Sequence, residues 1–414
     1  MFIADFHIHS KYSRATSRDC APETLELWAR RKGIGVIGTG DFTHPAWREE
    51  LKEKLVLSGE GLYILKDNFR KEDKVAGADF RPQFIVSGEI SSIYKKNGKV
   101  RKVHNLILLP GLEQAGAISH RLEAMGNLRS DGRPILGLDS RDLLEIVLDM
   151  CPEAIFIPAH IWTPHFSLYG AYSGFDDIKE CFEELTCYIY ALETGLSSDP
   201  PMNWRLSALD GFTLVSNSDA HSPANLGREA NIFNTALSYQ GILNALKNRG
   251  TKEFHGTIEF FPEEGKYHYD GHRACKVCWK PSDTRAAGGV CPVCGGRITV
   301  GVLHRVEALA DREEGFVPPA AKHFESLVPL YEVIASSTGS AVTSTKVKKK
   351  YDELIRNLGP ELFILREAPL NDIESAAGPY IAEGIRRLRC GEVEIKPGFD
   401  GEYGRIKLLF VKAQ

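Results

Sequence analysis

The sequence has no long apolar segment. Within its 414 residues, no run approaches the roughly 20 consecutive apolar residues that a membrane-spanning helix needs. The apolar run at the N-terminus is interrupted by Asp5, His7 and His9, which is untypical of a secretory signal peptide. We therefore expect a cytoplasmic protein with no membrane partner.

Two further absences exclude classes of protein. The sequence GxxxxGK[ST] does not occur, so the phosphate-binding loop of an ATP-driven helicase is missing. The formal net charge of −4 excludes a bulk polycation, so any contact with nucleic acid must come from local patches. Five of the nine cysteines are scattered without regular spacing, as expected of reduced thiols in the cytosol.

The chain is long enough for two or three domains. Strand-like runs alternate with helical patterns up to about residue 255, which predicts an α/β barrel over 1–255. Short, glycine-rich and cysteine-paired segments over 256–305 predict a zinc-binding module. A mostly helical pattern follows over 306–414, and residues 311–319 are the best linker candidate.

Seven apolar, β-branched-rich runs each carry a metal-liganding side chain at or beside one end. In barrels of alternating strands and helices, residues at the C-terminal ends of the strands point into one shared mouth. These side chains can therefore converge although they are far apart in sequence, which predicts a polynuclear metal site. The runs are FIADFHIH, IGVIGTGD, FIVSGE, VHNLILL, IFIPAH, YIYALE and TLVSNSDAH.

Two pairs of ligand residues have i, i+2 spacing. His7 and His9 lie on one face of a predicted strand, so both imidazoles can hold one ion. Asp219 and His221 repeat this geometry at the last strand. One such pair arises easily by chance, but two pairs at opposite ends of a barrel indicate a site. His160 closes its run after a Pro-Ala dipeptide, which suggests a sharp turn of the chain into the mouth.

The segment EISSIYKKNGKVRKVHN predicts a hairpin with a type I′ turn at Asn97-Gly98. This turn makes Glu89 and His104 diagonal neighbours on one face, where they could share a metal ion. The predicted register pairs Lys96 with Lys99, Ser91 with His104, and Glu89 with Leu106.

Four cysteines form two CxxC pairs separated by twelve residues. This spacing predicts a tetrahedral four-thiolate site for one structural zinc, because no position is left open for water. Gly295-Gly296 allows the tight turn that such a site needs. The predicted ligands are Cys275, Cys278, Cys291 and Cys294.

The motifs HIHS, GTGDFTHP, GEI followed by VHN, PAH and SDAH, in this order, resemble the polymerase and histidinol phosphatase (PHP) domain. The resemblance spans about residues 1–255 and implies a distorted seven-stranded β/α barrel that hydrolyses phosphoesters. It implies two or three divalent ions in the barrel, which would be zinc, magnesium or manganese. The matching ligand positions are His7, His9, Glu89, His104, His160, Asp219 and His221.

The sequence departs from the PHP pattern in two places. Asp41-Phe42 stands where the family usually has Asp-His, and KYSRATS lacks a further His or Asp. We expect Asp41 and His44 to substitute at the third metal position. Glu193 is either a ligand or a carboxylate that orients a histidine. The predicted catalytic residues are Asp219, Glu89 and Glu193.

The barrel motifs are followed by EFFPEEGKYHYDGHRACKVC and by a tail ending PGFDGEYGRIK, a combination that resembles the endonuclease Q family across essentially the whole chain. The resemblance implies a DNA repair endonuclease that cuts on the 5′ side of hypoxanthine, uracil, xanthine or abasic sites. Metal-activated water would attack the phosphodiester, and the lesion base would be flipped out of the helix. Double- or single-stranded DNA carrying deaminated bases is then the partner, with replication or repair factors as further partners.

Basic residues in the last hundred positions become candidates for DNA binding beside such a centre, although a lysine run is usually only a solvated face. They favour a DNA enzyme over two alternatives. One is a PHP-type phosphatase of a nucleotide or an amino-alcohol phosphate, with the zinc module used for dimerisation. The other is a DNA-binding adaptor with a degenerate barrel, which the near-complete ligand set disfavours. The basic candidates are Lys346, Lys348, Lys349, Lys350, Arg386, Arg387 and Arg389.

Overall fold

The computed structural model describes residues 1–73, 75 and 79–408. The strands are β1 (Phe2–Asp5), β2 (Val36–Gly38), β3 (Leu55–Leu57), β4 (Tyr63–Leu65), β5 (Gln83–Lys96), β6 (Lys99–Leu109), β7 (Ile135–Leu136), β8 (Ile155–Pro158), β9 (Ala191–Glu193), β10 (Thr213–Val215), β11 (Ala230–Phe233), β12 (Phe254–Glu259), β13 (Asp270–His272), β14 (Val277–Trp279), β15 (His323–Ser326), β16 (Glu394–Lys396) and β17 (Arg405–Lys407).

The α-helices are α1 (Pro22–Lys32), α2 (Pro45–Lys54), α3 (Leu112–Glu123), α4 (Ser140–Met150), α5 (Ile178–Phe182), α6 (Pro200–Asn203), α7 (Tyr239–Lys247), α8 (Pro281–Ala286), α9 (Val302–Leu309), α10 (Leu330–Thr338), α11 (Thr345–Leu358), α12 (Glu361–Arg366), α13 (Leu370–Ala377) and α14 (Pro379–Arg389). Among the described residues, no helix combines the length and apolarity needed to cross a bilayer.

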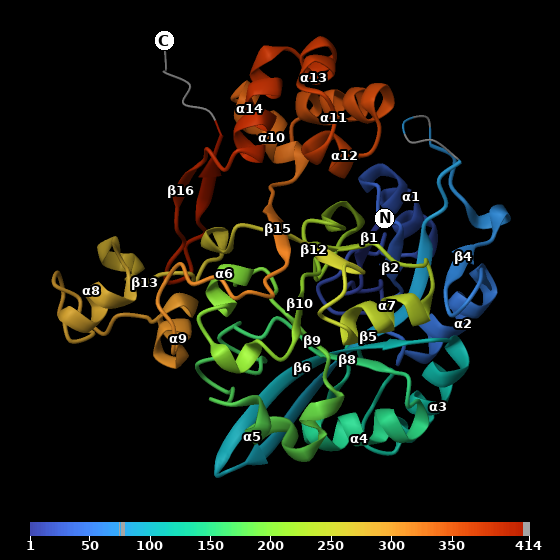
Figure 1. Cartoon of the computed structure of the whole chain (residues 1–414), viewed down its shortest axis with the longest axis horizontal. Coiled ribbons are helices and arrows are strands. Elements are labelled where there is room, and N and C mark those ends of the chain that lie inside the picture. Colours follow the sequence, from blue (N-terminus) through green and yellow to red (C-terminus); the bar gives the residue numbers. More distant parts are fainter. Residues whose placement is uncertain (74, 76–78, 409–414) are drawn as a thin grey trace.

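Figure 1 shows a strand-rich body, a small lobe around α8 and β13 at its left, and a group of helices from α10 to α14 at its top. The predicted mixed α/β fold and the helical C-terminal region are therefore confirmed. The helical group is tied to the body, because β15 pairs with β12 in the main sheet. In addition, the buried Lys32 Nζ on α1 lies 2.8 Å from Glu361 Oε2 on α12.

The strands that carry the predicted metal ligands run in two hydrogen-bonded series. β1, β2 and β5 are parallel neighbours, and β5, β6 and β8 continue antiparallel. β9 and β10 form a separate parallel pair. Beyond the ends of β1 and β10, a bridge joins Ile8 to Ala220, and His9 N–H donates to Ala220 O at 3.0 Å. This bridge brings the first and last ligand motifs side by side.

Local sequence signals explain where several elements begin and end. α1 starts with Pro22 and ends at Gly33, whose φ of 85° is costly for a residue with a Cβ atom. α4 is capped by Asp139, whose side chain accepts a hydrogen bond from Arg141 N–H. Both helices fall within the alternation of strands and helices predicted up to about residue 255.

The predicted hairpin between β5 and β6 is also confirmed. Asn97 and Gly98 have φ values of 52° and 73°, as a type I′ turn requires at both central positions. The observed pairs are Lys96 with Lys99, Ser91 with His104, and Glu89 with Leu106.

Candidate metal centre

Three candidate ligand or orienting residues sit where the backbone adopts a left-handed conformation. Asp41, His160 and Asp219 have φ values of 50°, 31° and 47°, which non-glycine residues seldom adopt. Each follows a strand end, so the chain turns sharply and presents its side chain at the mouth. Strain of this kind persists only where the surrounding structure enforces it, and it concentrates at functional sites.

Side chains from five strands converge into three overlapping groups of mutually close ligand atoms. The ligands of β1, β8 and β10 lie beyond the strand ends, as predicted, whereas Glu89 and His104 lie within β5 and β6, because the hairpin continues past them. Within each group, the ligand atoms lie within 4.8 Å of one another. Two residues, His9 and Glu89, each belong to two groups, so ions held by neighbouring groups would share ligands. The groups are His7, His9 and Glu89; His9, Asp219 and His221; and Glu89, His104 and His160.

Glu89 is the hub of this centre. Its carboxylate is buried, with Oε1 3.0 Å from His160 Nε2 and 2.5 Å from His104 Nδ1. Its Oε2 atom lies 3.4 Å from His9 Nε2 and 3.5 Å from His7 Nε2. The diagonal relation between Glu89 and His104 follows directly from the hairpin register described above.

Glu193 lies outside the three ligand groups and orients two of their histidines. Both of its oxygens lie 3.0 Å from His7 Nδ1, and Oε2 also accepts a hydrogen bond from His160 N–H at 2.8 Å. Asn217 Nδ2 donates to Glu193 Oε1 at 2.8 Å. Because Glu193 accepts a hydrogen bond from the Nδ1–H of His7, the Nε2 lone pair of His7 points toward the centre, and this buried atom has no hydrogen-bond partner. A metal ion fits that unsatisfied position.

Asp41 orients the imidazole of His9 in the same way. Its Oδ1 atom lies 3.1 Å from His9 Nδ1, and its Oδ2 atom accepts hydrogen bonds from Ser10 and Ser13. His44 instead places Nε2 3.3 Å from Arg129 O and stacks on Tyr12. Neither Asp41 nor His44 belongs to the close ligand groups of the described residues. Asp41 contacts the ligand residue His9, whereas His44 contacts no residue of these groups, so their predicted role as substitute ligands stays a prediction.

Burial and opposing charges together set the protonation of the centre. Burial raises the pKa of Glu89, but the neighbouring His104 and His7 lower it by more than burial raises it. The pKa of Glu89 is therefore well below its usual value. Burial lowers the pKa of His104 to about 4, against the opposing effect of Glu89. Glu89 is therefore a carboxylate and His104 a neutral imidazole near pH 7, and these are the forms that bind a metal ion.

One basic residue at the centre carried no recognisable signal in the sequence. Arg133 Nη1 lies 3.2 Å from Glu89 Oε2, and the side chain remains 28% exposed at the edge of the cluster. No spacing rule relates Arg133 to the ligand motifs, because it lies in the irregular segment between α3 and β7. Asn217 lies inside the run TLVSNSDAH, but its hydrogen-bond partner Glu193 lies 24 residues away, and no sequence pattern indicated that contact.

The small lobe contains a fourth group of ligand atoms within 4.8 Å of one another, made of His272, Cys275, Cys291 and Cys294. Three of the four predicted cysteines thus come together. Cys278, the remaining predicted ligand, lies outside this group of described residues, and His272 takes its place. The sequence suggested CxxC pairing, whereas the folded chain brings the preceding histidine to the site.

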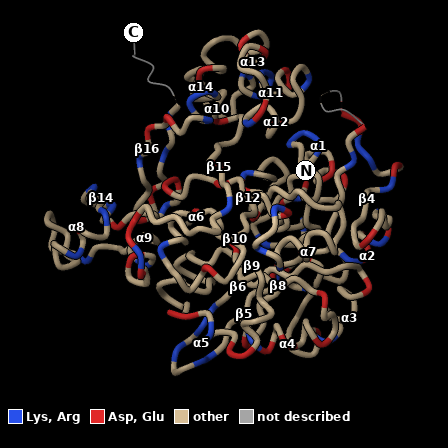
Figure 2. The backbone as a smooth tube through the Cα atoms, in the orientation of Figure 1, with Lys and Arg blue, Asp and Glu red and all other residues tan. Residues whose placement is uncertain are grey.

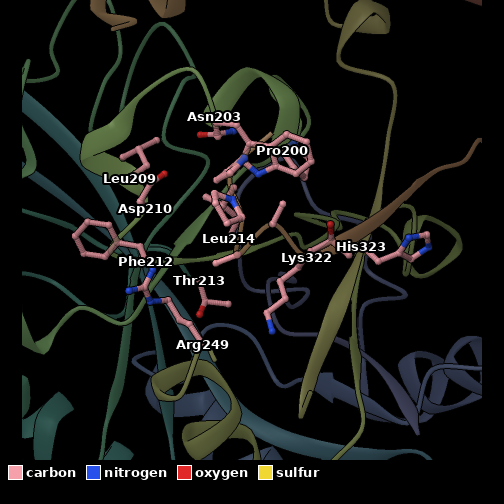
Figure 3. A pocket seen from close by; sticks show the side chains of 16 residues that line it. Pro200, Asn203, Leu209, Asp210, Phe212, Thr213, Leu214, Arg249, Lys322 and His323 are labelled. Carbon is pink, nitrogen blue, oxygen red and sulfur yellow. The ribbon is translucent and has the colours of Figure 1, made fainter. Parts of the chain in front are cut away.

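Two cavities differ in their relation to the centre. A cavity of about 860 Å³ adjoins the metal centre. Two of its lining residues, Thr163 and Arg228, contact residues of the centre or their neighbours. Thr163 Oγ1 is 3.1 Å from His160 Nδ1, and Arg228 Nε donates to Ser218 O, next to Asp219. A cavity of about 190 Å³, shown in Figure 3, is lined by Thr213 at the opposite, N-terminal end of β10. Its lining includes no predicted site residue.

The predicted basic residues of the C-terminal region differ in their exposure and in their ion pairs. Lys346, Lys348 and Lys349 are exposed on α11, and Lys350 pairs with Glu353 at 2.8 Å. Acidic and basic segments alternate along these helices (Figure 2), so the surface is not uniformly positive.

The three arginines of α14 are engaged within the domain. Arg386 pairs with Glu383 and Glu392, and Arg387 also pairs with Glu383. Arg389 donates to three backbone carbonyls at 2.8–2.9 Å. Arg386 and Arg387 thus pair mainly within their own helix, whereas Arg389 ties α14 to the end of α12. Their contact with DNA phosphates stays a prediction.

A cluster of histidines and carboxylates that can hold divalent ions, carried by the strands of an α/β fold, is the site of a metal-dependent phosphoesterase. Comparisons identify its family. Residues 329–392 match the family model described as the MJ0043 C-terminal domain. Over 417 aligned residues the chain is 30% identical to the uncharacterized protein YqxK of Bacillus subtilis (strain 168), and the match covers 98% of both chains.

Two solved structures resemble the whole chain. The lesion-specific endonuclease PfuEndoQ from Pyrococcus furiosus has a TM-score of 0.86 at 29% identity, covering 100% of this chain and 97% of that chain. An endonuclease Q in complex with a 27-mer duplex, which carries an abasic lesion at the active site, has a TM-score of 0.84 at 29% identity, covering 100% and 98%. This chain belongs to the endonuclease Q family.

Proposed function

We propose that this protein is a cytoplasmic DNA repair endonuclease that hydrolyses the phosphodiester on the 5′ side of hypoxanthine, uracil, xanthine or an abasic site. The observation that carries the proposal is the set of three ligand groups joined by His9 and Glu89. The solved endonuclease Q with an abasic duplex at its active site supports duplex DNA as the substrate. Replication or repair factors are proposed as further partners.

The proposal keeps the predicted architecture. Strands β1, β2, β5, β6, β8, β9 and β10 would form the seven-stranded PHP barrel over 1–255. The zinc module would span 256–305 and the helical DNA-binding domain 306–414. The bridge between Ile8 and Ala220, which links the two series of strands at the mouth, supports this arrangement.

In the proposed hydrolysis, separate groups of residues bind the ions, orient the histidines and contact the phosphate. Glu89, Asp219 and the histidines would hold two or three divalent ions, and the mixed imidazole and carboxylate donors suit zinc or manganese, with magnesium as the alternative. Bound ions would supply Lewis-acid activation of water and charge for the departing oxygen. Glu193 and Asp41 fix the ring orientations of His7 and His9. Arg133, at the edge, is placed to pair with phosphate oxygens.

The 860 Å³ cavity is our candidate for the flipped base. It lies between the loop after His160 and the Tyr267–His268 segment, whose residues line it. Tyr172, Tyr267 and Tyr403 provide aromatic faces at its rim. A base extruded beside the cleavage site could stack on such faces, and a deaminated or mismatched base costs less to unpair.

The test uses 5′-labelled duplexes that contain hypoxanthine, an abasic site or no lesion, incubated with the protein and resolved on a denaturing gel. We expect one cut on the 5′ side of each lesion, a product with a 3′-OH that a polymerase can extend, and an intact control duplex. The Asp219→Asn variant should cut none of them. Intact lesion duplexes together with rapid hydrolysis of a nucleoside monophosphate would instead indicate the small-molecule phosphatase.

A further inference from the structure

We propose that the cavity of about 190 Å³ at the N-terminal end of β10 is a second ligand site, which takes an aromatic carboxylate with one ring. Its wall comes from β10, β12 and β15, from the segment around α6 and from the end of the predicted linker. The metal ligands of the last motif lie beyond the opposite end of β10. The second site is thus separate from the metal centre and does not rest on the proposed function.

The size of the cavity fits one ring. An apolar protein cavity of about 150 Å³ is large enough to bind benzene. The cavity at β10 has a volume of about 190 Å³, so a six-membered ring fits together with one small substituent. The cavity therefore selects small ligands.

The wall of the cavity is rich in apolar and flat side chains that remain partly exposed. Trp204, Phe212 and Leu214 line it, and each is only half-buried. Pro318 and Pro319, at the end of the predicted linker, add further apolar surface. Transfer of an apolar ring from water onto such a wall is favourable, and aromatic side chains give a flat ring additional contact energy. The wall thus favours an aromatic ring over a wholly polar ligand.

Two cationic side chains line the same cavity and favour an anion. Figure 3 shows Arg249 and Lys322 on either side of Thr213. Among the described residues, the guanidinium of Arg249 has no hydrogen-bond or ion-pair partner. Lys322 Nζ donates to Thr251 O at 2.7 Å, and partial burial lowers the pKa of this ammonium group. A negative charge in the cavity would pair with the first cation and stabilise the second.

The acidic groups near the cavity are engaged with other partners. Asp210, which lines the cavity, accepts a hydrogen bond from Arg312 Nη1 at 2.8 Å. Glu325, on β15, pairs with Arg366 at 2.7 Å. The positive charge of Arg249 therefore stays available to a ligand. A planar guanidinium binds a carboxylate through two parallel hydrogen bonds, so a carboxylate is the anion that suits this edge of the cavity.

A buried hydroxyl in the wall also lacks a partner. Thr257, on β12, lines the cavity and is 2% exposed, and its Oγ1 atom has no hydrogen-bond partner among the described residues. Most buried polar groups in folded proteins are hydrogen-bonded, so an unsatisfied one calls for an explanation. A carboxylate oxygen in the cavity would accept the hydrogen bond of this hydroxyl.

The first test is isothermal titration calorimetry of the full-length protein with benzoate, benzyl alcohol and acetate. These probes carry the ring with the charge, the ring alone and the charge alone. We expect benzoate to bind at one site per chain and the other two probes to bind at least about tenfold more weakly. Equal affinity for benzyl alcohol would overturn the requirement for an anion, and equal affinity for acetate the requirement for a ring. Absence of saturable benzoate binding would overturn the site itself.

The second test uses variants to place the bound benzoate. Arg249→Gln should weaken its binding at least about tenfold, because the paired charge is lost. Lys252→Gln, an exposed position three residues further on and outside the lining, is the matched control and should bind benzoate normally. Ala321→Trp, which fills the cavity from its wall, should abolish binding without lowering the melting temperature.

Undiminished binding in Arg249→Gln would overturn the proposal, even if Ala321→Trp failed to fold. Undiminished binding in a folded Ala321→Trp would overturn it as well, because benzoate would then occupy another place, such as the metal centre. An equal loss in Lys252→Gln would reduce the effect to overall charge and reject the site. None of these readouts depends on DNA cleavage, so failure here leaves the proposed function untouched.

Discussion

Asp219 shows how much of this centre depends on single side chains. Its Oδ1 atom is 3.0 Å from His9 Nε2 and 3.6 Å from His7 Nε2, and its backbone is held in the left-handed region. It therefore joins two of the histidines at the mouth and supplies a charged oxygen that an amide cannot replace.

We expect Asp219→Asn to lower cleavage by about a hundredfold or more, because several kcal/mol of transition-state stabilisation depend on the ions it holds. DNA affinity should stay largely unchanged. Cleavage of the hypoxanthine duplex, metal content and DNA binding are the measurements. Asp149→Asn, at an exposed position of α4, is the matched control. Full activity with normal metal content in Asp219→Asn would remove Asp219 from the site.

A second buried carboxyl makes stability depend on pH. Glu259 on β12 is fully buried, and its Oε2 atom accepts hydrogen bonds from Thr194 and Ser216. Burial, aided by the charge of Asp199, raises its pKa from 4.5 to about 8. The folded protein therefore keeps this carboxyl protonated at pH values at which the unfolded chain has ionised it.

The sign of the effect follows from proton linkage. Between pH 4.5 and about 8 the folded state holds one proton more than the unfolded state, so this contribution to stability is complete below pH 4.5 and is lost as pH rises toward 8. Glu259→Gln should flatten the fall in unfolding free energy over that range, measured by denaturant unfolding. Glu374→Gln, at an exposed position, should leave the pH dependence of the unfolding free energy unchanged. Equal slopes for all three proteins would contradict the assignment.

At the scale of elements, helices α11 and α14 explain why the basic residues of the C-terminal region differ. α11 buries Val347, Tyr351 and Leu354 on one face and leaves its lysine run on the other. On α14 the arginines serve as internal pairing groups. Position on a helix face, and not charge alone, decides which of them can reach a phosphate.

If the lysines of α11 clamp phosphates, changing Lys346, Lys348, Lys349 and Lys350 together to Ala should weaken lesion-containing and normal duplexes by similar factors. The plot of log affinity against log salt should flatten by roughly one unit for each lysine that neutralises a phosphate in the unmodified protein. Specificity should survive, because phosphates carry no information on the lesion. An unchanged salt slope would show that the four lysines of α11 form a solvated helix face that does not contact DNA.

Arg389→Ala provides the contrasting control. This change leaves three carbonyls, those of Ile364, Leu365 and Ala368, without their donor. We expect a loss of about 1–3 kcal/mol in the unfolding free energy of the helical domain, by denaturant titration, and an unchanged salt slope. A flatter salt slope with intact stability would instead assign Arg389 to DNA binding.

For the whole molecule, the metal centre joins distant parts of the chain. Its ligands span positions from His7 to His221, and they meet only when β1 and β10 lie side by side. An unfolded chain cannot present this arrangement, so ions bind the folded state and stabilise it by mass action.

Removing divalent ions with a chelator should therefore abolish cleavage and lower the melting temperature, and adding manganese, zinc or magnesium should restore both. Repeating the titration with Asp219→Asn should give a smaller gain in melting temperature at the same metal concentration. Undiminished cleavage by protein shown to be free of metal would exclude the proposed mechanism.

Much of the centre was predictable because alternation along a strand and hairpin register obey simple geometric rules. His7 and His9, and Asp219 and His221, were identified from their spacing, and Glu89 with His104 from the hairpin register, which the structure reproduces. For Glu193 the sequence left two roles open, and its contact with His7 favours the orienting one. Arg133 was missed, because it lies in an irregular segment with no fixed spacing to the ligand motifs.

The sequence by itself determined the strand-end motifs, the hairpin and the helical character of the last hundred residues, since periodicity and turn chemistry act over a few neighbouring residues. The tertiary structure alone decided that Asp41 orients His9, that Arg389 donates to the carbonyls at the end of α12, and that His272 rather than Cys278 joins the cysteine group. Equal spacings of two residues leave His272 and Cys278 indistinguishable in sequence. Only the direction in which the folded backbone turns at Lys276 separates them.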